Sequence, residues 1–122
     1  METRDIESFF ELYINDKRFN VDLSVYECGW ERCAPSHHFG PTKRNYYIFH
    51  FIFGGKGVYK VNNQLFEVGE NQIFNIYPNE IHQYTASFEE PWEYFWIGFN
   101  GVEVPQIIKE IFKENKYVVS VL

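Results

Sequence analysis

The chain has 122 residues, a formal net charge of −6 and 20% aromatic residues. This length suits one domain with a core of its own and leaves no room for a second domain of ordinary size. The acidic balance argues against nucleic-acid binding by this polypeptide alone, because neutralising phosphates requires a surplus of Lys and Arg. The first residues lack the pattern of a signal peptide, and no apolar run reaches membrane-spanning length, so we expect a cytoplasmic protein.

The first predicted element is a short amphipathic helix in an N-terminal arm, residues 1–20. One helical face, with i, i+3, i+4, i+7 spacing, is formed by Ile6, Phe9, Phe10 and Tyr13. Thr3 or Asp5 is placed to cap the first turn. We expect this helix to pack on the body of the domain.

Short strands are predicted from residue 21 to residue 101. Alternating apolar and polar residues predict a strand at 21–26, followed by a turn at 28–30 and a loop as far as Pro41. β-Branched and aromatic residues predict a hairpin with strands 46–53 and 58–61 around a glycine-rich turn. A turn at Asn62 and Asn63 leads to the remaining strands, expected at 65–68, 72–77, 81–86 and 92–99. So many short strands at close spacing are typical of a sandwich or a barrel.

The last part, residues 102–122, is predicted to contain a helix followed by a strand. Pro105 suits the first turn of a helix, and Lys109 lies toward the end where a positive charge is favourable. The apolar stripe of this helix is formed by Ile107, Ile108, Ile111 and Phe112. The strand is expected at 118–122. A chain that stops on such an apolar segment is expected to continue in a longer protein.

The predicted strand at 92–99 has two chemically different faces. Trp92, Tyr94 and Trp96 share one face, and each of these rings keeps an N–H or O–H donor. The other face is purely apolar and consists of Phe95, Ile97 and Phe99. Because every polar group in a sealed core needs a partner, the first face suits a pocket for a partly polar ligand.

Several motifs occur together, in order, between residues 28 and 101. They are Cys28-Gly29-Trp30-Glu31-Arg32-Cys33, Phe39-Gly40-Pro41, Arg44, Gly55-Lys56-Gly57, Gly69, and the stretches 78–84 and 91–101. This combination resembles the N-terminal effector-binding domain of AraC-type transcription regulators. The resemblance implies a mainly β, cupin-like jelly-roll barrel at residues 21–101 that binds a small effector, often a sugar. It also implies DNA binding through a separate C-terminal domain with two helix-turn-helix motifs, and a homodimer formed through helices that would begin about where this chain ends. For the strand at 92–99 the resemblance implies that Tyr94 and Trp96 face the effector, whereas the face of Phe95, Ile97 and Phe99 packs outward against a helix.

The resemblance also implies which side chains bind the effector. The predicted ligand-binding residues are Trp96, Tyr94, Tyr84, Arg44, His82 and Trp92. Aromatic rings can stack on the apolar C–H face of a sugar, while Arg44 and His82 can bond to its hydroxyls. Trp92 points to the same side of its strand as Tyr94 and Trp96. The alternative for Trp92 is a position at the rim of the barrel, away from the ligand. A further alternative is that the rings simply fill a small barrel.

His82 also lies where cupin enzymes place one metal ligand. The other ligands of that set, a His-x-His pair and a Glu, are not recognisable, because His37 and His38 are adjacent and no Glu lies between His38 and Gly57. An ordinary histidine or an effector contact is therefore favoured over a metal ligand at His82, and no cofactor is expected.

The two cysteines could form a zinc site, Cys28 and Cys33 with His37 or His38. The spacing is looser than C-x₂-C and no fourth ligand is evident, which favours cysteines that act as small buried hydrophobes. His50 lies in the most hydrophobic strand and is expected to be a neutral core histidine.

No catalytic signature is present, whether G-x-S-x-G, a P-loop or a dinucleotide fingerprint. We therefore predict a non-enzymatic, carbohydrate-sensing domain that controls DNA binding by a C-terminal domain and has no membrane partner. One alternative is a small metal-dependent cupin enzyme, such as a sugar isomerase or a dioxygenase. Another is a structural or dimerisation module with a filled barrel.

Overall fold

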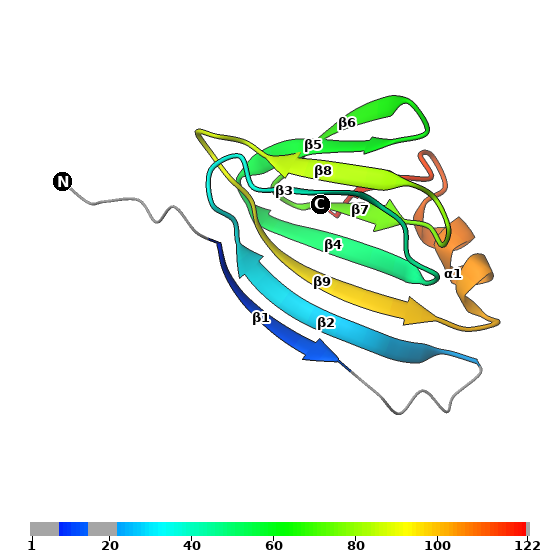
Figure 1. The fold of residues 1–122 in the computed structure, drawn as a ribbon. Helices are drawn as coiled ribbons and strands as arrows, with labels where there is room; N and C mark the ends of the chain where they lie inside the picture. Colours follow the sequence, from blue (N-terminus) through cyan, green and yellow to red (C-terminus); the bar gives the residue numbers. More distant parts are fainter. Residues whose placement is uncertain (1–7, 15–21, 122) are drawn as a thin grey trace.

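The computed structural model describes residues 8–14 and 22–121, and this part of the chain is mainly β (Figure 1). The strands are β1 (Phe9–Ile14), β2 (Ser24–Arg32), β3 (His38–Thr42), β4 (Tyr47–Gly54), β5 (Lys56–Val61), β6 (Gln64–Gly69), β7 (Gln72–Ile76), β8 (His82–Ala86), β9 (Glu93–Asn100) and β10 (Val118–Ser120). A helix, α1 (Val104–Ile111), lies between β9 and β10 in the chain. Within residues 8–14 and 22–121, no helix has the length and apolar character needed to cross a membrane.

The strands form two sheets that face each other and enclose the core (Figure 1). The larger sheet has the order β1-β2-β9-β4-β7-β10, and the smaller has the order β3-β8-β5-β6. The largest side chains buried between the sheets are Trp92, Tyr59, Tyr94 and Phe74, each less than 2% exposed. The inward direction predicted for Tyr94 and Trp96 is thus confirmed: Tyr94 belongs to the core, as Trp92 does, and the partly buried Trp96 packs against it.

The helix α1 packs on the outer face of the six-stranded sheet, as predicted. Val104 and Ile108 are its buried residues, and Phe112 follows the helix into the same cluster. The strand residues of that cluster are Phe49, Ile73 and Phe99, with Ile97 at its edge. Pro105 stands in the first turn, where its missing N–H costs no hydrogen bond. Ile111, which the predicted apolar stripe includes, lies at the edge of this contact and is 40% exposed.

Replacing Ile108 with alanine is expected to lower the free energy of unfolding by about 3 kcal/mol, because a buried isoleucine loses its contacts and leaves a cavity. The matched variant Ile111→Ala, at the exposed edge of the same helix, is expected to cost less than about 1 kcal/mol. Urea unfolding of both variants measures the difference. Equal losses would contradict the packing of this helix.

The helix predicted in the N-terminal arm is wrong where the structure describes that arm. Residues 9–14 form β1, which pairs antiparallel with β2 from Phe9 opposite Arg32 to Ile14 opposite Glu27. The segment is rich in aromatic residues, which favour strands, and an isolated helix of this length is unstable in water. The pairing of β1 with β2 also provides hydrogen-bond partners for the backbone N–H and C=O groups along that edge of β2. The remainder of the predicted helix and its cap, including Ile6, lies outside the described residues.

Two further local predictions fail because residues that permit a turn do not require one. The segment 28–30, predicted as a turn, lies within β2, and part of the predicted loop forms β3, which pairs with β8. The hairpin predicted over 46–61 is also absent, because β4 pairs with β7 and β9 whereas β5 pairs with β6 and β8. The chain changes sheets at Gly55, whose φ is 76°.

The other predicted turns and strands agree with the structure. Asn62 and Asn63 have φ values of 50° and 59° and connect β5 to β6 in an antiparallel hairpin. Strands β6 to β9 begin and end within two residues of their predicted bounds. The strand predicted at the end of the chain is β10, which pairs with β7 and extends the larger sheet.

Candidate ligand-binding cavity

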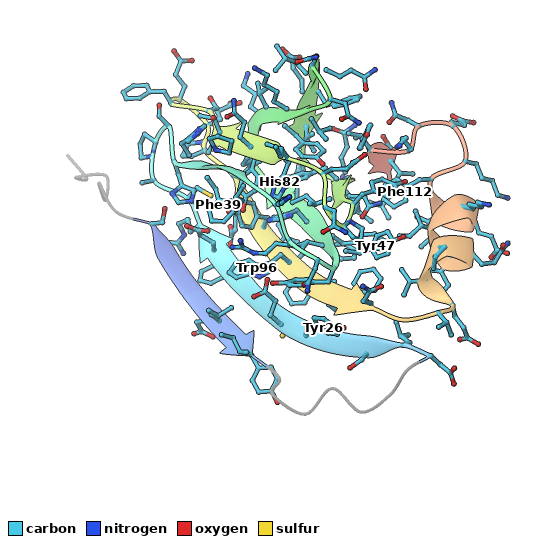
Figure 2. The ribbon with its side chains drawn as sticks, turned by 45° about the vertical axis from the view of Figure 1, so that its right-hand side comes forward. Tyr26, Phe39, Tyr47, His82, Trp96 and Phe112 are labelled. Atoms are coloured by element: carbon cyan, nitrogen blue, oxygen red, sulfur yellow. The ribbon has the colours of Figure 1, made fainter. Side chains whose placement is uncertain are left out.

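A cavity of about 290 Å³ opens between the two sheets. It is lined by residues of both sheets and of the loops that join them: Leu12, Glu27, Glu31, His37, Phe39, Arg44, Ile48, His50, Ile76, His82, Tyr84, Tyr94 and Trp96. Figure 2 shows Phe39, His82 and Trp96 gathered between the sheets, away from Tyr47 and Phe112 on the side of the helix. The barrel is therefore not completely filled by its own side chains.

Most of the predicted ligand-binding residues line this cavity. They are Trp96, Tyr94, Tyr84, Arg44 and His82. Trp92 does not line it: the side chain is fully buried, and its Nε1 donates a hydrogen bond to the carbonyl oxygen of Val68 at 2.9 Å. Alternation along a strand gives the direction of a side chain but not its depth in the barrel. Trp92 is thus a core residue rather than a residue of the cavity wall or rim.

The wall formed by β2, β9 and β4 is built from side chains in cross-strand register. Gly29 and His50 lie opposite Trp96 on the two neighbouring strands, and Glu31 lies opposite Tyr94. A Cβ atom at Gly29 would overlap the indole ring of Trp96. Glycine at this position therefore leaves the space next to β2 that the half-buried indole occupies in the cavity wall.

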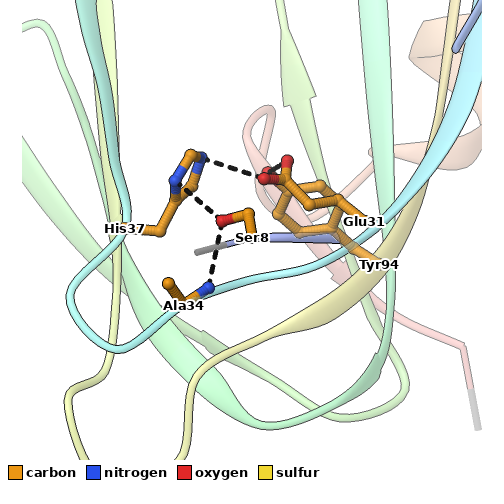
Figure 3. A network of polar contacts seen from close by, with 5 residues as sticks. All are labelled: Ser8, Glu31, Ala34, His37 and Tyr94. Carbon is orange, nitrogen blue, oxygen red and sulfur yellow. Dashed lines mark hydrogen bonds and ion pairs between the residues drawn. The ribbon is translucent and has the colours of Figure 1, made fainter. Parts of the chain in front are cut away.

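A buried carboxylate stands at the centre of a polar network (Figure 3). Glu31 is 8% exposed; its Oε1 accepts a hydrogen bond from the Tyr94 hydroxyl at 2.9 Å, and its Oε2 is 3.3 Å from His37 Nε2. The Ser8 hydroxyl is 3.1 Å from His37 Nδ1 and accepts from the Ala34 N–H at 3.0 Å. The network connects the segment before β1 to the loop after β2 and fixes the direction of the carboxylate.

Two buried histidines face the cavity with unused hydrogen-bonding capacity. His50 is 3% exposed and His82 is 1% exposed, and His50 Nδ1 and His82 Nε2 have no hydrogen-bond partner within the described residues. The Nδ1 atom of His82 is 3.3 Å from the Glu80 carbonyl oxygen, so Nδ1 carries the proton and Nε2 presents a lone pair. Neutral His82 is thus able to accept a hydrogen bond from a ligand.

Burial also determines the charge of both imidazoles. Loss of solvation lowers the pKa of His50 well below its ordinary value, and the nearby His82 lowers it further. Burial lowers the pKa of His82 as well; the Glu80 carbonyl opposes this effect and the Arg44 guanidinium adds to it. The prediction of a neutral, buried His50 agrees with this environment, but His50 also forms part of the cavity wall.

Cationic and phenolic groups complete the polar lining. The Arg44 guanidinium lies 5.5 Å from the ring centre of Phe39, and its Nη1 donates to the Thr42 hydroxyl at 3.3 Å. Burial raises the pKa of Tyr84 and of Tyr94, so both phenols keep their protons at neutral pH. The cavity therefore offers stacking surfaces together with both hydrogen-bond donors and acceptors.

Sequence reasoning missed several lining residues, notably Glu31, His37, Phe39 and His50. The sequence did contain a signal for Glu31. In a strand that continues through residue 32, Gly29 and Glu31 share the inner face, while the larger Trp30 and Arg32 point to the other side. The turn predicted at 28–30 concealed this alternation. Phe39 and His37 reach the cavity only through the packing of the two sheets.

One group of side chains has the composition of a metal site. Ligand atoms of Glu31, Cys33 and His37 all lie within 4.8 Å of one another, and carboxylate, thiol and imidazole are ligands that suit zinc. In the described part of the chain this group includes neither Cys28, which we considered for a zinc site, nor His82, the candidate cupin-type ligand. Burial raises the pKa of the Cys33 thiol to about 12, so it is protonated at neutral pH.

Solved structures with a similar fold include cupin barrel proteins. Oxalate decarboxylase from Bacillus subtilis superposes with a TM-score of 0.63 at 13% sequence identity, over 80% of this chain and 26% of the decarboxylase chain. A cupin 2 conserved barrel domain protein from Salinispora arenicola superposes with a TM-score of 0.60 at 14% identity, over 90% of this chain and 98% of its own. These likenesses confirm the predicted cupin-like barrel; at such identities they concern the fold alone.

Sequence comparison identifies relatives that are operon regulators, two of them named for the lactose and raffinose operons. The Msm operon regulatory protein of Streptococcus mutans is 40% identical over 92 residues, which are 75% of this chain and 33% of that protein. The raffinose operon transcriptional regulatory protein of Pediococcus pentosaceus is 32% identical over 73% of this chain, and the lactose operon transcription activator of Staphylococcus xylosus is 26% identical over 69%.

The chain spans about a third of the length of these relatives: the match covers 33% of the Msm and raffinose operon regulators and 30% of the lactose operon activator. The family match extends further along this chain, from residue 24 to residue 121, and so includes the whole cavity wall from β2 to β9 together with α1 and β10. The predicted resemblance is confirmed: the chain belongs to the AraC-like ligand binding domain family.

Proposed function

We propose that this domain binds a sugar in the barrel cavity and that a longer protein uses this binding to regulate transcription. The observation that carries the proposal is the position of the half-buried Trp96 indole in one cavity with two buried imidazole nitrogens that have no hydrogen-bond partner among residues 8–14 and 22–121. An aromatic ring can stack on the C–H face of a sugar, and the polar groups can bond to its hydroxyls. The relatives named for lactose and raffinose operons make a sugar the first class of ligand to test.

Each predicted contact has a distinct role in this proposal. Trp96 stacks on a sugar ring, Arg44 donates to hydroxyl oxygens, and His82 accepts from a hydroxyl through its Nε2 lone pair. Tyr84 and Tyr94 add phenolic hydroxyls that donate or accept. Since the cavity lies between two sheets, a bound sugar would contact strands of both and hold them together.

Leu12 gives the cavity a connection to the N-terminal part of the chain. This residue of β1 lines the cavity, and β1 is the edge strand of the larger sheet. A sugar in contact with Leu12 would stabilise one arrangement of β1 over others, which is the unequal affinity for two states that a switch requires. We propose this contact as the route from the effector to the remainder of a longer protein.

A cupin enzyme is the competing function, because oxalate decarboxylase shares the fold. A metal-dependent enzyme of this kind would use His82 as a ligand, and a stoichiometric transition metal that is lost in His82→Ala would favour it. The sugar-operon regulators among the relatives favour a sensor instead.

A thermal-shift screen of the purified chain tests the proposal directly. Neutral mono-, di- and trisaccharides, including lactose and raffinose, are added at increasing concentration. A sugar that binds the folded state at 100 times its Kd is expected to raise the free energy of unfolding by about 2.7 kcal/mol. A complete absence of stabilisation by every sugar would contradict the proposed function and favour a structural module.

A further inference from the structure

We propose that the cavity selects uncharged sugars and that the Glu31 carboxylate discriminates against their phosphorylated and uronic acid forms. This inference rests on the proposed function, because it specifies the class of sugar that the same cavity accepts. It concerns a residue that the sequence did not indicate as a ligand contact.

The charged groups of the cavity wall are unevenly balanced. Two carboxylates line it, Glu27 and Glu31, against the single guanidinium of Arg44. His37 lies beside Glu31 at 3.3 Å and is partly exposed, whereas His50 and His82 are deeply buried and uncharged at neutral pH. A phosphate or carboxylate group on the ligand would therefore enter a cavity in which fixed negative charges outnumber the one permanent positive charge.

Glu31 is the more buried of the two carboxylates that line the cavity. It is 8% exposed, and Tyr94 and His37 hold its two oxygens in a fixed direction. A carboxylate has about four acceptor positions, so these contacts leave capacity for ligand hydroxyls. Its carboxylate would attract hydroxyl donors and repel an anionic oxygen at the same place, since like charges in a poorly solvated site interact strongly.

The unpartnered imidazole nitrogens favour the same class of ligand. The Nε2 atom of His82 presents a lone pair, because its Nδ1 proton points to the Glu80 carbonyl oxygen. A sugar hydroxyl can donate to this lone pair, whereas an ionised phosphate or carboxylate oxygen can only accept. In the described part of the chain, His50 Nδ1 is also buried without a hydrogen-bond partner. A hydroxyl can satisfy this atom in either tautomer, as donor or as acceptor.

Arg44 by itself is not a site for an anion. Its guanidinium is placed over the Phe39 ring and bonded to the Thr42 hydroxyl. Phosphate recognition ordinarily combines several donors, such as a bidentate arginine with backbone N–H groups or a second cation. No other arginine or lysine lines this cavity within the described residues, so Arg44 is better suited to bond a neutral hydroxyl oxygen.

Isothermal titration calorimetry with matched ligands tests the inference. The probes are galactose, galactose 6-phosphate and galacturonic acid, the corresponding three glucose compounds, and lactose beside lactose 6-phosphate. We expect each neutral sugar that binds to do so at least about tenfold more tightly than its anionic counterpart. Tighter binding of the phosphate or the uronic acid would overturn the inference, and this comparison uses the unmodified chain.

The variant Glu31→Gln tests the assigned residue, because it keeps the shape of the side chain and removes its charge. We expect this variant to bind the neutral sugar more weakly. We also expect the ratio of its affinities for the neutral and the anionic sugar to be about tenfold smaller than in the wild type. The matched control is Glu93→Gln, whose carboxylate accepts from Trp30 Nε1 at 3.1 Å and does not line the cavity. An unchanged preference in Glu31→Gln, or an equal change in both variants, would refute the role of Glu31.

The two proposals fail in different ways. If neither neutral nor anionic sugars bind, the proposed function is wrong and this inference falls with it. If sugars bind without regard to charge, or if anionic sugars bind more tightly, the proposed function stands and only the selectivity is wrong.

Discussion

Replacing Trp96 with alanine is expected to weaken sugar binding about 30-fold or more while the barrel still folds. The indole is the largest aromatic surface on the cavity wall, and it lies against Gly29, where no side chain can substitute for it. Because it is only half-buried, its removal costs less stability than the loss of a core tryptophan such as Trp92. Calorimetric titration with a sugar found in the thermal-shift screen measures the affinity, and far-ultraviolet circular dichroism reports the fold.

Two further variants separate stacking from other effects of this substitution. Trp96→Phe keeps an aromatic face and removes the N–H donor, so it is expected to retain more affinity than the alanine variant. Trp30→Ala removes a tryptophan from the neighbouring strand whose Nε1 bonds to Glu93 outside the cavity, and it is expected to leave the affinity unchanged. Wild-type affinity in Trp96→Ala would mean that the ligand occupies another place.

The sequence allowed much of the barrel to be predicted, because local patterns determine most of its strands. β-Branched and aromatic runs located β4, and turn residues such as Asn62 and Asn63 located the β5–β6 hairpin. What failed depended on partners far along the chain. β1 is a strand because the edge of β2 is available to pair with it, and β4 and β5 separate because each finds better-packed neighbours in a different sheet.

The candidate site likewise contains residues that local patterns predict and residues that only the pairing of distant strands brings together. Alternation in β9 and resemblance to the family led to Tyr94 and Trp96, and both line the cavity. Glu31 and His50 lie beside them only because β2 and β4 pair with β9 in one particular register. Local alternation does not specify that register, and it does not specify depth either, which is why Trp92 was included among the ligand contacts although it fills the core.

The pairing of these strands also brings several polar side chains to one cavity wall, where a ligand could bond to them. A strand that supplied only apolar residues to this space would allow the barrel to close, as it does around Trp92 and Phe74. Instead β2, β4 and β8 each contribute a buried ionisable residue, namely Glu31, His50 and His82. His50 Nδ1 and His82 Nε2 have no hydrogen-bond partner within the described residues, and both histidines line this cavity. Because an unpaired polar atom in a core is unfavourable, a ligand hydroxyl that bonds to either nitrogen would stabilise the folded domain.

Acidification is expected to destabilise the domain because His50 and His82 are buried in their neutral forms. Their folded-state pKa values are lowered from 6.5, so below pH 6.5 the unfolded chain binds protons that the folded chain does not. Stability from this source is fully present above pH 6.5 and is lost as the pH falls toward the folded-state pKa. Each such histidine contributes up to about 1.4 kcal/mol per pH unit in that range.

The variant His50→Gln isolates this effect. It removes one titrating group, so the loss of unfolding free energy between about pH 6.5 and pH 5 is expected to be smaller than in the wild type. The control variant is Leu65→Gln, at a position that is 68% exposed. It introduces the same side chain without removing a titrating group, so its slope is expected to equal that of the wild type. Urea unfolding at several pH values provides the slopes. If His50→Gln and the wild type lose stability in parallel, His50 is not a source of the acid sensitivity, and its neutral state cannot be what keeps the cavity uncharged at that position.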